Sequence, residues 1–445
     1  MKTPIYDFVK KYTERKPSRF HMPGHKGRVF LGCEPYDITE IDGADVLYSA
    51  EGIIAESENN ATRLFGSAHT FYSAEGSTLT IKAMLALAVN CSPRGKRPVI
   101  MAARNAHKAF IHACALLDID VIWLYPNCDE HICSVKITAE AVENALREGD
   151  IPAAVYLTSP DYLGNIADVE GIAKVCKTRG VPLLVDNAHG AYLNFLKRSM
   201  HPLTYGADMC CDSAHKTFPV LTGGAYLHIS QNASSEYLSS ARNMLSVFSS
   251  TSPSYLILES LDLCNKYLSD GYSNLLVNTV EKLDLVKSKL SSFGFSVMDT
   301  EPLKLVVNTS EYGYTGYEAA VRLRKNNIEV EFYDDEYIVL MATPENSDED
   351  FERLTGAFLS FPKNKPICKN HVTLLRGERV MSIRDAVFSK REMVSVDDAV
   401  GRISASPTVS CPPAVPIVVS GEVITKESVA IFKKYNINKI SVVAE

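Results

Sequence analysis

The chain has 445 residues, which is long enough to bury a substantial core and to form two or three folding units. Apolar residues make up 46% and charged residues 22%, and the net charge of −7 gives no electrostatic reason to expect nucleic acid or an anionic membrane as partner. Residues 1–20 contain no apolar signal-peptide core, and no apolar run approaches the roughly 18 residues of a membrane span. We therefore expect a cytoplasmic protein with neither nucleic-acid nor membrane partners.

The 11 cysteines are scattered along the chain, and none forms a C-x-x-C pair. This spacing argues against a disulfide framework or a zinc site, and we expect reduced, mostly buried thiols and no bound metal. Cys210 and Cys211 are adjacent in a strand-like segment, so their side chains should point to opposite faces of a sheet.

Residues 1–60 are rich in turn formers and charge, and we interpret them as an arm packed on a larger domain. Pro23, Gly24 and Gly27 exclude a regular element at 20–28. From 61 to 292, short apolar strands alternate with helical patterns, which is typical of an α/β domain with a mostly parallel sheet covered on both faces. The last two strands have no clear helix between them, so one of them should run antiparallel. Strands are expected at 98–103, 120–125, 153–158, 182–187, 207–213 and 223–229, and helices at 77–89, 106–117, 169–180 and along 253–292.

A second, smaller α/β pattern follows at 293–362. Its expected strands are 304–309, 328–332 and 337–342, and its expected helices are 316–326 and 347–360. Two prolines in 361–370 indicate a linker. Residues 371–445, which contain the turn-rich segment CPPAVPIVVSGE (411–422), should form a small appended domain.

Two motifs follow strands and carry reactive groups. In DSAHKT (212–217), Lys216 can reach a cleft above the sheet, and lysine is the residue that forms imines with aldehydes. In VDNAHG (185–190), Asp186 ends a very apolar strand, and a buried carboxylate needs a cationic partner such as a protonated pyridine. Taken singly, the lysine could be a solvated charge and the aspartate a cap on a loop or helix.

Two further motifs lie where strands meet helices. AEGSTLT (74–80) opens a helical segment, and Gly76, Ser77 and Thr78 with the free N–H groups of the helix start would make a cup for a phosphate. In RNAHK (104–108), His107 could lie flat on an aromatic cofactor. An ordinary helix cap and a solvent-exposed histidine are the alternatives. Along the chain the motifs follow in the order phosphate cup, His107, Asp186 and Lys216, and all lie where strands meet loops. Parallel α/β sheets bind ligands at such positions, so the four motifs together are a stronger indication than each alone.

The chain resembles the bacterial ornithine/lysine/arginine decarboxylase family, within the aspartate-aminotransferase-like (fold type I) enzymes that use pyridoxal 5′-phosphate (PLP). The resemblance runs over nearly the whole length, and its C-terminal pieces separate it from general aminotransferases. The matching segments are FHMPGHKG (20–27), DITEIDGADVLYSAEG (37–52), ATRLFG (61–66), EGST (75–78), RNAHK (104–108), TSPDYLG (158–164), LLVDNAHGAY (183–192), SAHKT (213–217), TSPSY (251–255), MSIRDAVF (381–388) and CPPAVPIVVSGE (411–422).

The resemblance implies a role for each of these positions. Lys216 would hold PLP through an imine, Asp186 would pair with its pyridine nitrogen, and His107 would stack on its ring. Ala188 would pack on the other face, and His189 would line the pocket. Gly76, Ser77, Thr78, Ser213 and His215 would surround the phosphate.

The resemblance also implies decarboxylation of arginine, lysine or ornithine to a polyamine-type amine, with His215 or Lys216 returning a proton to Cα. Glu422 would meet the distal positive charge of the substrate, and the active site would lie in a homodimer. A different PLP reaction, such as transamination or a lyase step, and a non-catalytic PLP-binding relative are the alternatives. The sequence departs from the family pattern at Glu75 (usually Asn), Asn187 (usually Glu), Ala109, Gly223, Gly224, Cys411 and Ala414.

Overall fold

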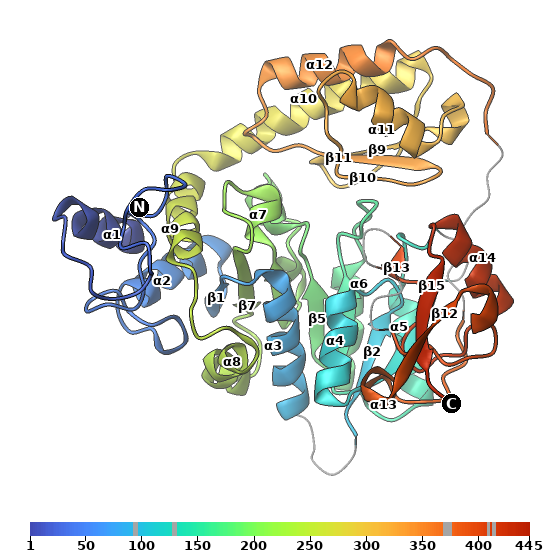
Figure 1. Cartoon of the computed structure of the whole chain (residues 1–445), viewed down its shortest axis with the longest axis horizontal. Helices are drawn as coiled ribbons and strands as arrows, with labels where there is room; N and C mark the ends of the chain where they lie inside the picture. Colours follow the sequence, from blue (N-terminus) through green and yellow to red (C-terminus); the bar gives the residue numbers. More distant parts are fainter. Residues whose placement is uncertain (92–96, 127–130, 368–375, 407–409, 412–414) are drawn as a thin grey trace. The chain divides into compact units, whose positions relative to one another are not determined.

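A computed structural model describes residues 1–91, 97–126, 131–367, 376–406, 410–411 and 415–445 (Figure 1). The chain divides into two compact units, and each is described by itself. The first unit comprises residues 1–96, 150–157 and 169–274, and the second comprises 97–149, 158–168 and 275–445. No helix in the described part of the chain is both long enough and apolar enough to cross a membrane.

The main sheet has seven strands in the order β1-β7-β6-β5-β4-β2-β3. Strand β5 pairs in parallel with β6, and β2 pairs in parallel with β3, as expected for an α/β fold. Strand β7 runs antiparallel to both β6 and β1, which confirms that one of the last two predicted strands is reversed. The strands are β1 (His69–Ser73), β2 (Val99–Ala103), β3 (Asp120–Leu124), β4 (Ala154–Thr158), β5 (Leu183–Asp186), β6 (Met209–Asp212) and β7 (Ala225–Ile229).

The first unit contains four helices that the sequence interpretation did not identify. They are α1, α2, α7 and α8, and residues 1–60 contain α1 and most of α2. Helix α1 is anchored through its N-terminus, where the Asp262 carboxylate accepts hydrogen bonds from the backbone N–H groups of Ile5 (2.9 Å) and Tyr6 (3.0 Å). Residues 20–28 contain neither helix nor strand, as predicted. The α-helices are α1 (Pro4–Glu14), α2 (Ile53–Phe65), α3 (Gly76–Asn90), α6 (Val169–Arg179), α7 (Ala214–Thr217), α8 (Ser235–Phe248) and α9 (Tyr255–Ser269).

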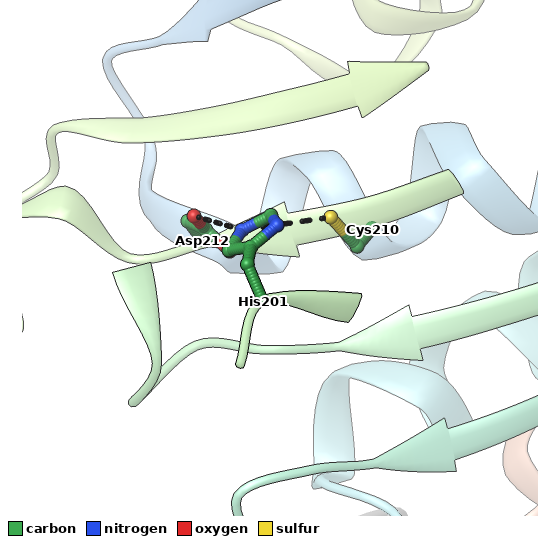
Figure 2. A group of neighbouring side chains, drawn as sticks. All are labelled: His201, Cys210 and Asp212. Atoms are coloured by element: carbon green, nitrogen blue, oxygen red, sulfur yellow. Dashed lines mark hydrogen bonds and ion pairs between the residues drawn. The ribbon is translucent and has the colours of Figure 1, made fainter. Parts of the chain in front are cut away.

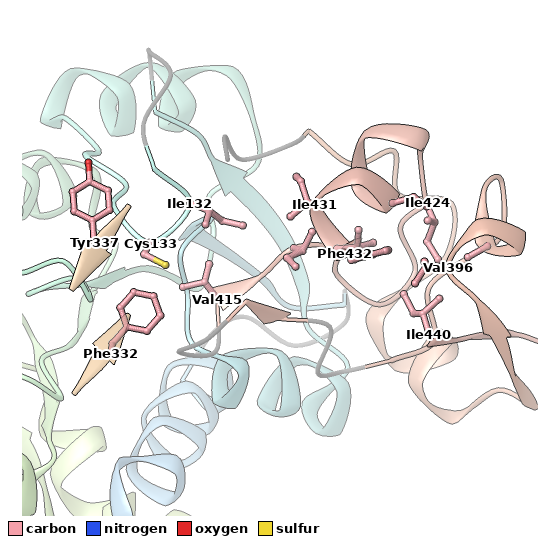
Figure 3. Packing of buried hydrophobic residues seen from close by; sticks show 14 of the residues in the cluster. Ile132, Cys133, Phe332, Tyr337, Val396, Val415, Ile424, Ile431, Phe432 and Ile440 are labelled. Carbon is pink, nitrogen blue, oxygen red and sulfur yellow. The ribbon is translucent and has the colours of Figure 1, made fainter. Parts of the chain in front are cut away.

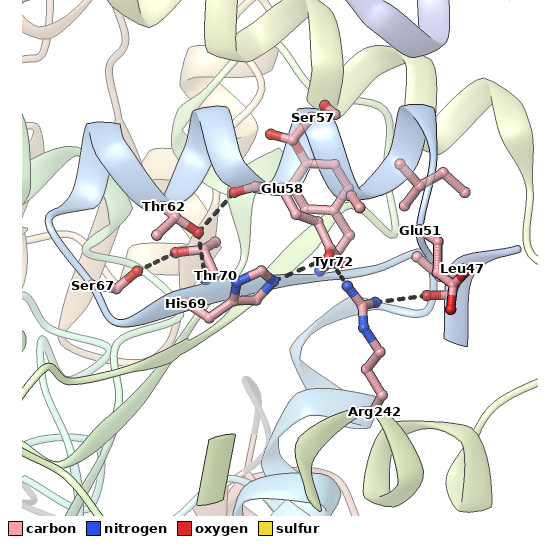
Figure 4. A network of polar contacts seen from close by, with 12 residues as sticks. Leu47, Glu51, Ser57, Glu58, Thr62, Ser67, His69, Thr70, Tyr72 and Arg242 are labelled. Carbon is pink, nitrogen blue, oxygen red and sulfur yellow. Dashed lines mark hydrogen bonds and ion pairs between the residues drawn. The ribbon is translucent and has the colours of Figure 1, made fainter. Parts of the chain in front are cut away.

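A buried carboxylate ties α2 to strand β1 (Figure 4). Glu58 accepts hydrogen bonds from the Arg242 guanidinium, from the backbone N–H of Tyr72 (3.0 Å) and from His69 (3.2 Å). Because its charge is shared among these donors, Glu58 can be fully buried. Strand β1 escaped the sequence interpretation because its polar side chains are buried in hydrogen bonds and produce no apolar run.

Helix α10 (Tyr272–Phe293) starts at the end of the first unit and continues into the second. The predicted helical stretch 253–292 is therefore two helices, and the break falls at Gly271, whose φ of +94° favours glycine. The other helices of the second unit are α4 (Lys108–Leu117), α5 (Ala139–Glu148), α11 (Gly316–Arg324), α12 (Asp348–Leu359), α13 (Ile383–Phe388) and α14 (Lys426–Lys434).

The second unit also contains a four-stranded antiparallel sheet in the order β10-β11-β9-β8. The strand predicted at 328–332 is wrong in extent, since only Phe332–Tyr333 pair. Asn327 adopts a left-handed turn (φ +57°), and the chain after it rejoins the sheet only at residue 332. The strands are β8 (Ser296–Val297), β9 (Lys304–Asn308), β10 (Phe332–Tyr333) and β11 (Tyr337–Met341).

The C-terminal part has its own two-stranded sheets, β12 (Arg391–Ser395) with β15 (Lys439–Val443) and β13 (Ser410–Cys411) with β14 (Val415–Pro416). Apolar side chains from this part share one core with residues from earlier in the second unit (Figure 3). Phe432 and Val442 are fully buried in it, together with Ile132 and Val339. The residues after 376 are therefore built into the second unit by apolar packing.

Candidate active site

Lys216 lies on α7, a single helical turn that directly follows β6. Its Nζ is 2.9 Å from Nε2 of His189, which is 5% exposed in the loop after β5. The structure thus brings together two residues that are 27 positions apart. Because Nε2 of a neutral imidazole can accept a hydrogen bond, His189 can hold the amine in a fixed direction.

Asp186 is the last residue of β5 and is 2% exposed. Its carboxylate accepts hydrogen bonds from the Tyr156 hydroxyl (3.1 Å) and the Ala188 backbone N–H (3.2 Å), and the Cys211 thiol lies 3.6 Å away. Burial raises the pKa of Asp186, and the positive charge of Lys216 partly offsets that rise. Such a carboxylate favours a cationic group placed against it.

Tyr156 is a site residue that the sequence interpretation did not identify. It lies in β4 and is fully buried, and its hydroxyl donates to Asp186. The signal was present, because a tyrosine in an otherwise apolar buried strand needs a partner for its hydroxyl. The sequence could not show which polar group that partner is.

His215 precedes Lys216 and is half-buried. Its Nδ1 lies 3.0 Å from the carbonyl oxygen of Gly224, and since a carbonyl only accepts, Nδ1 carries the proton. Burial lowers the pKa of His215, and Lys216 lowers it further. The neutral ring therefore leaves Nε2 able to accept a proton at neutral pH.

A pair of hydroxyls lies at the start of α3. Ser213 donates a hydrogen bond to Ser77 over 2.9 Å. Helix α3 begins at Gly76 and runs for 15 residues, so its first N–H groups favour a bound anion. Thr78 is exposed in this first turn. The phosphate-binding role of these residues stays a prediction.

Glu75 is the residue whose charge would oppose such an anion. It is exposed, and its Oε1 accepts a hydrogen bond from the backbone N–H of Ser250 over 2.6 Å. The carboxylate is thus engaged by another loop of the same unit. This contact accounts for a glutamate at a position where the family usually has asparagine.

The glycines at 223 and 224 also have a geometric reason. Gly223 has a φ of +104°, its carbonyl accepts a hydrogen bond from the Gly76 N–H (2.7 Å), and a Cβ there would lie 3.0 Å from the Ala74 carbonyl oxygen. A Cβ on Gly224 would lie 2.3 Å from a methyl of Val220. The turn after Lys216 therefore supports the start of α3 and has no room for side chains.

His107 and Glu422 belong to the second unit and are described there alone. His107 caps α4, because its Nδ1 accepts a hydrogen bond from the Ala109 N–H over 3.1 Å. This contact fixes the direction of a half-buried imidazole. The stacking role of His107 stays a prediction.

Glu422 is 3% exposed and lies 3.4 Å from the guanidinium of Arg104, which is fully buried. Its Oε2 also accepts a hydrogen bond from the Val419 N–H over 2.8 Å. Arg104 donates to the carbonyl oxygens of Pro416 (2.8 Å) and Ile417 (3.3 Å) as well. The Pro412-Pro413 turn lies outside the described residues, as do Ala414 and the surroundings of Cys411.

The fold is that of the fold type I, aspartate-aminotransferase-like class. The lysine decarboxylase LdcF of Francisella novicida superposes with a TM-score of 0.79 at 16% identity, covering 99% of this chain and 81% of that one. The constitutive lysine decarboxylase of E. coli gives 0.78 at 17% identity, covering 100% and 82%. A serine palmitoyltransferase of Sphingomonas wittichii gives 0.57 at 16% identity, covering 79% and 82%. At these identities the likeness concerns the fold.

Residues 3–296 match the model of the Orn/Lys/Arg decarboxylase major domain, and residues 377–437 match that of its C-terminal domain. The arginine decarboxylase of Bacillus subtilis (strain 168) is 31% identical over 97% of this chain and 93% of its own length. The arginine decarboxylase of Halalkalibacterium halodurans is 30% identical over 98% and 93%. The chain belongs to the Orn/Lys/Arg decarboxylase family and is an amino-acid decarboxylase.

The close approach at Gly223 leads to a stability prediction. Gly223→Ala should destabilise the protein by about 1–3 kcal/mol more than Gly271→Ala. Both glycines have positive φ, but a Cβ on Gly271 meets nothing within 4 Å, so only Gly223→Ala adds a steric clash. Chemical denaturation of the two variants measures the difference, and equal losses would contradict the proposed contact with Ala74.

Proposed function

We propose that the chain uses PLP, held on Lys216, to decarboxylate a basic amino acid, with arginine as the first candidate. The observation that carries this proposal is the pairing of Lys216 with His189 beside a buried carboxylate, Asp186, within one unit. The Bacillus subtilis and Halalkalibacterium halodurans relatives reported above, at 31% and 30% identity, are named arginine decarboxylases, which supports arginine ahead of lysine and ornithine.

The residues of the first unit fit PLP. Asp186 is buried with its pKa raised, so a protonated pyridine nitrogen would relieve the cost of its ionised form. Ser77, Ser213 and the N-terminus of α3 offer donors to a phosphate. We assign Gly76 and Thr78 to the same phosphate, and Ala188 to one face of the ring. When bound, PLP supplies an electron sink for the charge left on Cα as CO₂ departs.

The chain's own groups hold charge and move protons in the proposed reaction. The Asp186 carboxylate, oriented by the Tyr156 hydroxyl, stabilises positive charge on a pyridine nitrogen. His189 directs Nζ of Lys216. A proton can be returned to Cα from Nζ of Lys216, or from Nε2 of His215 after that nitrogen has taken up a proton, since Nδ1 holds the proton of the neutral ring. His107 would cover the ring.

We propose four domains for the chain, as the sequence predicted. An arm at 1–60 and a PLP-binding domain at 61–292 precede a small α/β domain at 293–362 and a C-terminal domain at 371–445. We also propose that the protein forms a homodimer and is cytoplasmic. Large apolar side chains of the arm are exposed (Phe20 97%, Phe30 80%, Leu31 86%). Exposed apolar side chains of this size favour contact with a second copy of the chain. Light scattering, which measures the molar mass in solution, tests the dimer. The eight cysteines whose side chains the structure describes are free thiols, as in a reducing compartment.

The activity test compares two products from one panel of amino acids. With PLP supplied, the protein should release CO₂ from arginine, lysine or ornithine without forming a keto acid, and borohydride should trap PLP on Lys216. Lys216→Ala should lose both, whereas Lys197→Ala, at an exposed lysine of the same unit, should lose neither. Keto-acid formation would favour the transaminase alternative, and trapping on another lysine would make the site assignment wrong.

Asp186→Asn tests the role of the buried carboxylate. The variant should still bind PLP but lose turnover by roughly 100-fold or more, because an amide does not stabilise a pyridinium. Asp208→Asn is a matched control, since Asp208 accepts a hydrogen bond from Leu183 at the start of the same strand pair. Steady-state kcat measures both variants, and full activity of Asp186→Asn would rule out the electron-sink role.

Glu422 remains our candidate for the carboxylate that meets the distal charge of the substrate. Glu422→Gln should raise KM for the best substrate about 10- to 100-fold without changing the visible spectrum, since a charge-assisted hydrogen bond contributes ~1.5–3 kcal/mol. Glu427→Gln, at an exposed residue of the same segment, is the control.

The contact with Arg104 gives this test a second informative outcome. If Glu422 serves only as the partner of the buried guanidinium, Glu422→Gln should lower the free energy of unfolding and leave KM unchanged. That result would move the distal-charge site to another carboxylate.

A further inference from the structure

A second buried carboxylate lies beside the candidate active site. Asp212 ends β6 and is fully buried. Its Oδ2 lies 3.0 Å from Nε2 of His201 and 3.1 Å from Nε2 of His228, and its Oδ1 accepts a hydrogen bond from the Asn187 amide over 2.7 Å. Figure 2 shows the His201 ring directed at Asp212. One carboxylate therefore has three donors.

The hydrogen bonds assign the protons of both imidazoles. Nδ1 of His201 lies 3.4 Å from the backbone N–H of Leu203, which can only donate, so the proton of a neutral His201 sits on Nε2 and is given to Asp212. Nδ1 of His228 is 2.8 Å from the Thr70 hydroxyl, which leaves its Nε2–H for Asp212. Burial lowers the pKa of His228, so this ring is neutral at pH 7.

Asp212 itself stays ionised. Burial alone would raise the pKa of this carboxyl, but the donors on His201 and His228 outweigh burial and hold the pKa well below its usual range. Asp212 therefore keeps a buried negative charge, which accepts hydrogen bonds from two imidazoles and one amide.

The position of Asp212 in the chain connects this charge to the active site. Asp212 immediately precedes Ser213 in the loop that leads to Lys216, and Asn187 lies between Asp186 and Ala188. The Asn187 backbone N–H also donates to the Cys211 carbonyl over 3.0 Å. The amide–carboxylate contact thus joins the ends of the adjacent parallel strands β5 and β6, from which Asp186 and Lys216 are presented.

We propose that Asp212, supported by His201 and His228, is a positioning residue that holds Asn187 and thereby sets Asp186 and Lys216 relative to each other. The inference rests on the proposed PLP-dependent function. It also explains why residue 187 is an asparagine here, where the family usually has glutamate. A second carboxylate within 2.7 Å of an ionised Asp212 would require one of the two to take up a proton.

A metal ion is the competing explanation for this cluster. The ligand atoms of His201, Cys210 and Asp212 lie within 4.8 Å of one another. A metal would take the lone pair of Nε2 on His201, yet the contact with Leu203 places the proton on that nitrogen. The hydrogen-bonded arrangement is therefore favoured, and metal content belongs in the test.

The test exchanges the amide of Asn187 and the carboxylate of Asp212 between the two positions. Asn187→Asp keeps the side-chain shape and should lower kcat about 10-fold or more, change the visible spectrum of bound PLP and leave KM little changed. Adding Asp212→Asn should restore kcat to within about 3-fold of wild type, because the new amide can accept from both imidazoles through its oxygen and donate to the new carboxylate at 187. Asn243→Asp, at an exposed residue of the same unit, should behave as wild type.

The outcomes separate this inference from the proposed function. A wild-type protein that neither binds PLP nor releases CO₂ would refute the function, whereas an active wild type with no rescue in the double variant would refute the positioning role. The same cycle measured by denaturation reports the coupling without PLP. If the single variant does not fold, recovery of folding in the double variant supports the contact, and failure of both overturns it.

Two measurements on the wild-type holoenzyme complete the test. Side-chain ¹⁵N NMR should find a proton on Nε2 of both His201 and His228, with the His228 ring neutral near pH 7. An Nε2 without a proton on either ring, or an imidazolium signal from His228, would overturn the proton assignment. One bound transition metal per chain that is lost in Cys210→Ser would overturn the hydrogen-bonded cluster.

Discussion

The burial of two carboxylates at the ends of adjacent parallel strands is the constraint on which the candidate site depends. Asp186 ends β5, Asp212 ends β6, and both are at most 2% exposed. The surroundings of the two carboxylates shift their pKa values in opposite directions. Three donors satisfy Asp212, and two of them, His201 and His228, lower its pKa, whereas burial dominates at Asp186 and raises its pKa. The first carboxylate therefore holds the loops together, and the second retains a preference for a cationic ligand.

This division explains how the site tolerates its departures from the family pattern. Asn187 replaces a residue that is usually acidic, and it serves as a donor to Asp212. Glu75 places a carboxylate near the start of α3, but that carboxylate is engaged by the backbone of Ser250. Gly223 brings its carbonyl to the first N–H of α3. Each of these three residues has a partner on another loop of the first unit, which accounts for its place near Lys216.

Features with a local cause could be predicted from the sequence. The apolar strands ending at Asp186 and Asp212, the helix start at Gly76 and the reversal of β7 follow from periodicity, turn chemistry and the absence of a connecting helix. Strand β1 could not be predicted, because its buried polar residues satisfy one another through the tertiary fold. Tyr156, His201 and His228 were missed for the same reason, since their partners lie 30, 11 and 16 residues away.

Glu422 illustrates what a motif leaves open even when it points to the right kind of residue. The segment predicted a carboxylate with a cationic partner, and the structure supplies one within the second unit, the buried Arg104. A buried guanidinium without a carboxylate is strongly unfavourable, so Glu422 has a reason to be acidic that is independent of any substrate. Arg104 also bonds the carbonyls at 416 and 417 and lies three residues before His107. One ion pair therefore fixes the C-terminal segment to the strand that leads to His107. A substrate bound to Glu422 would share the Glu422 carboxylate with Arg104, a partner that the fold already requires.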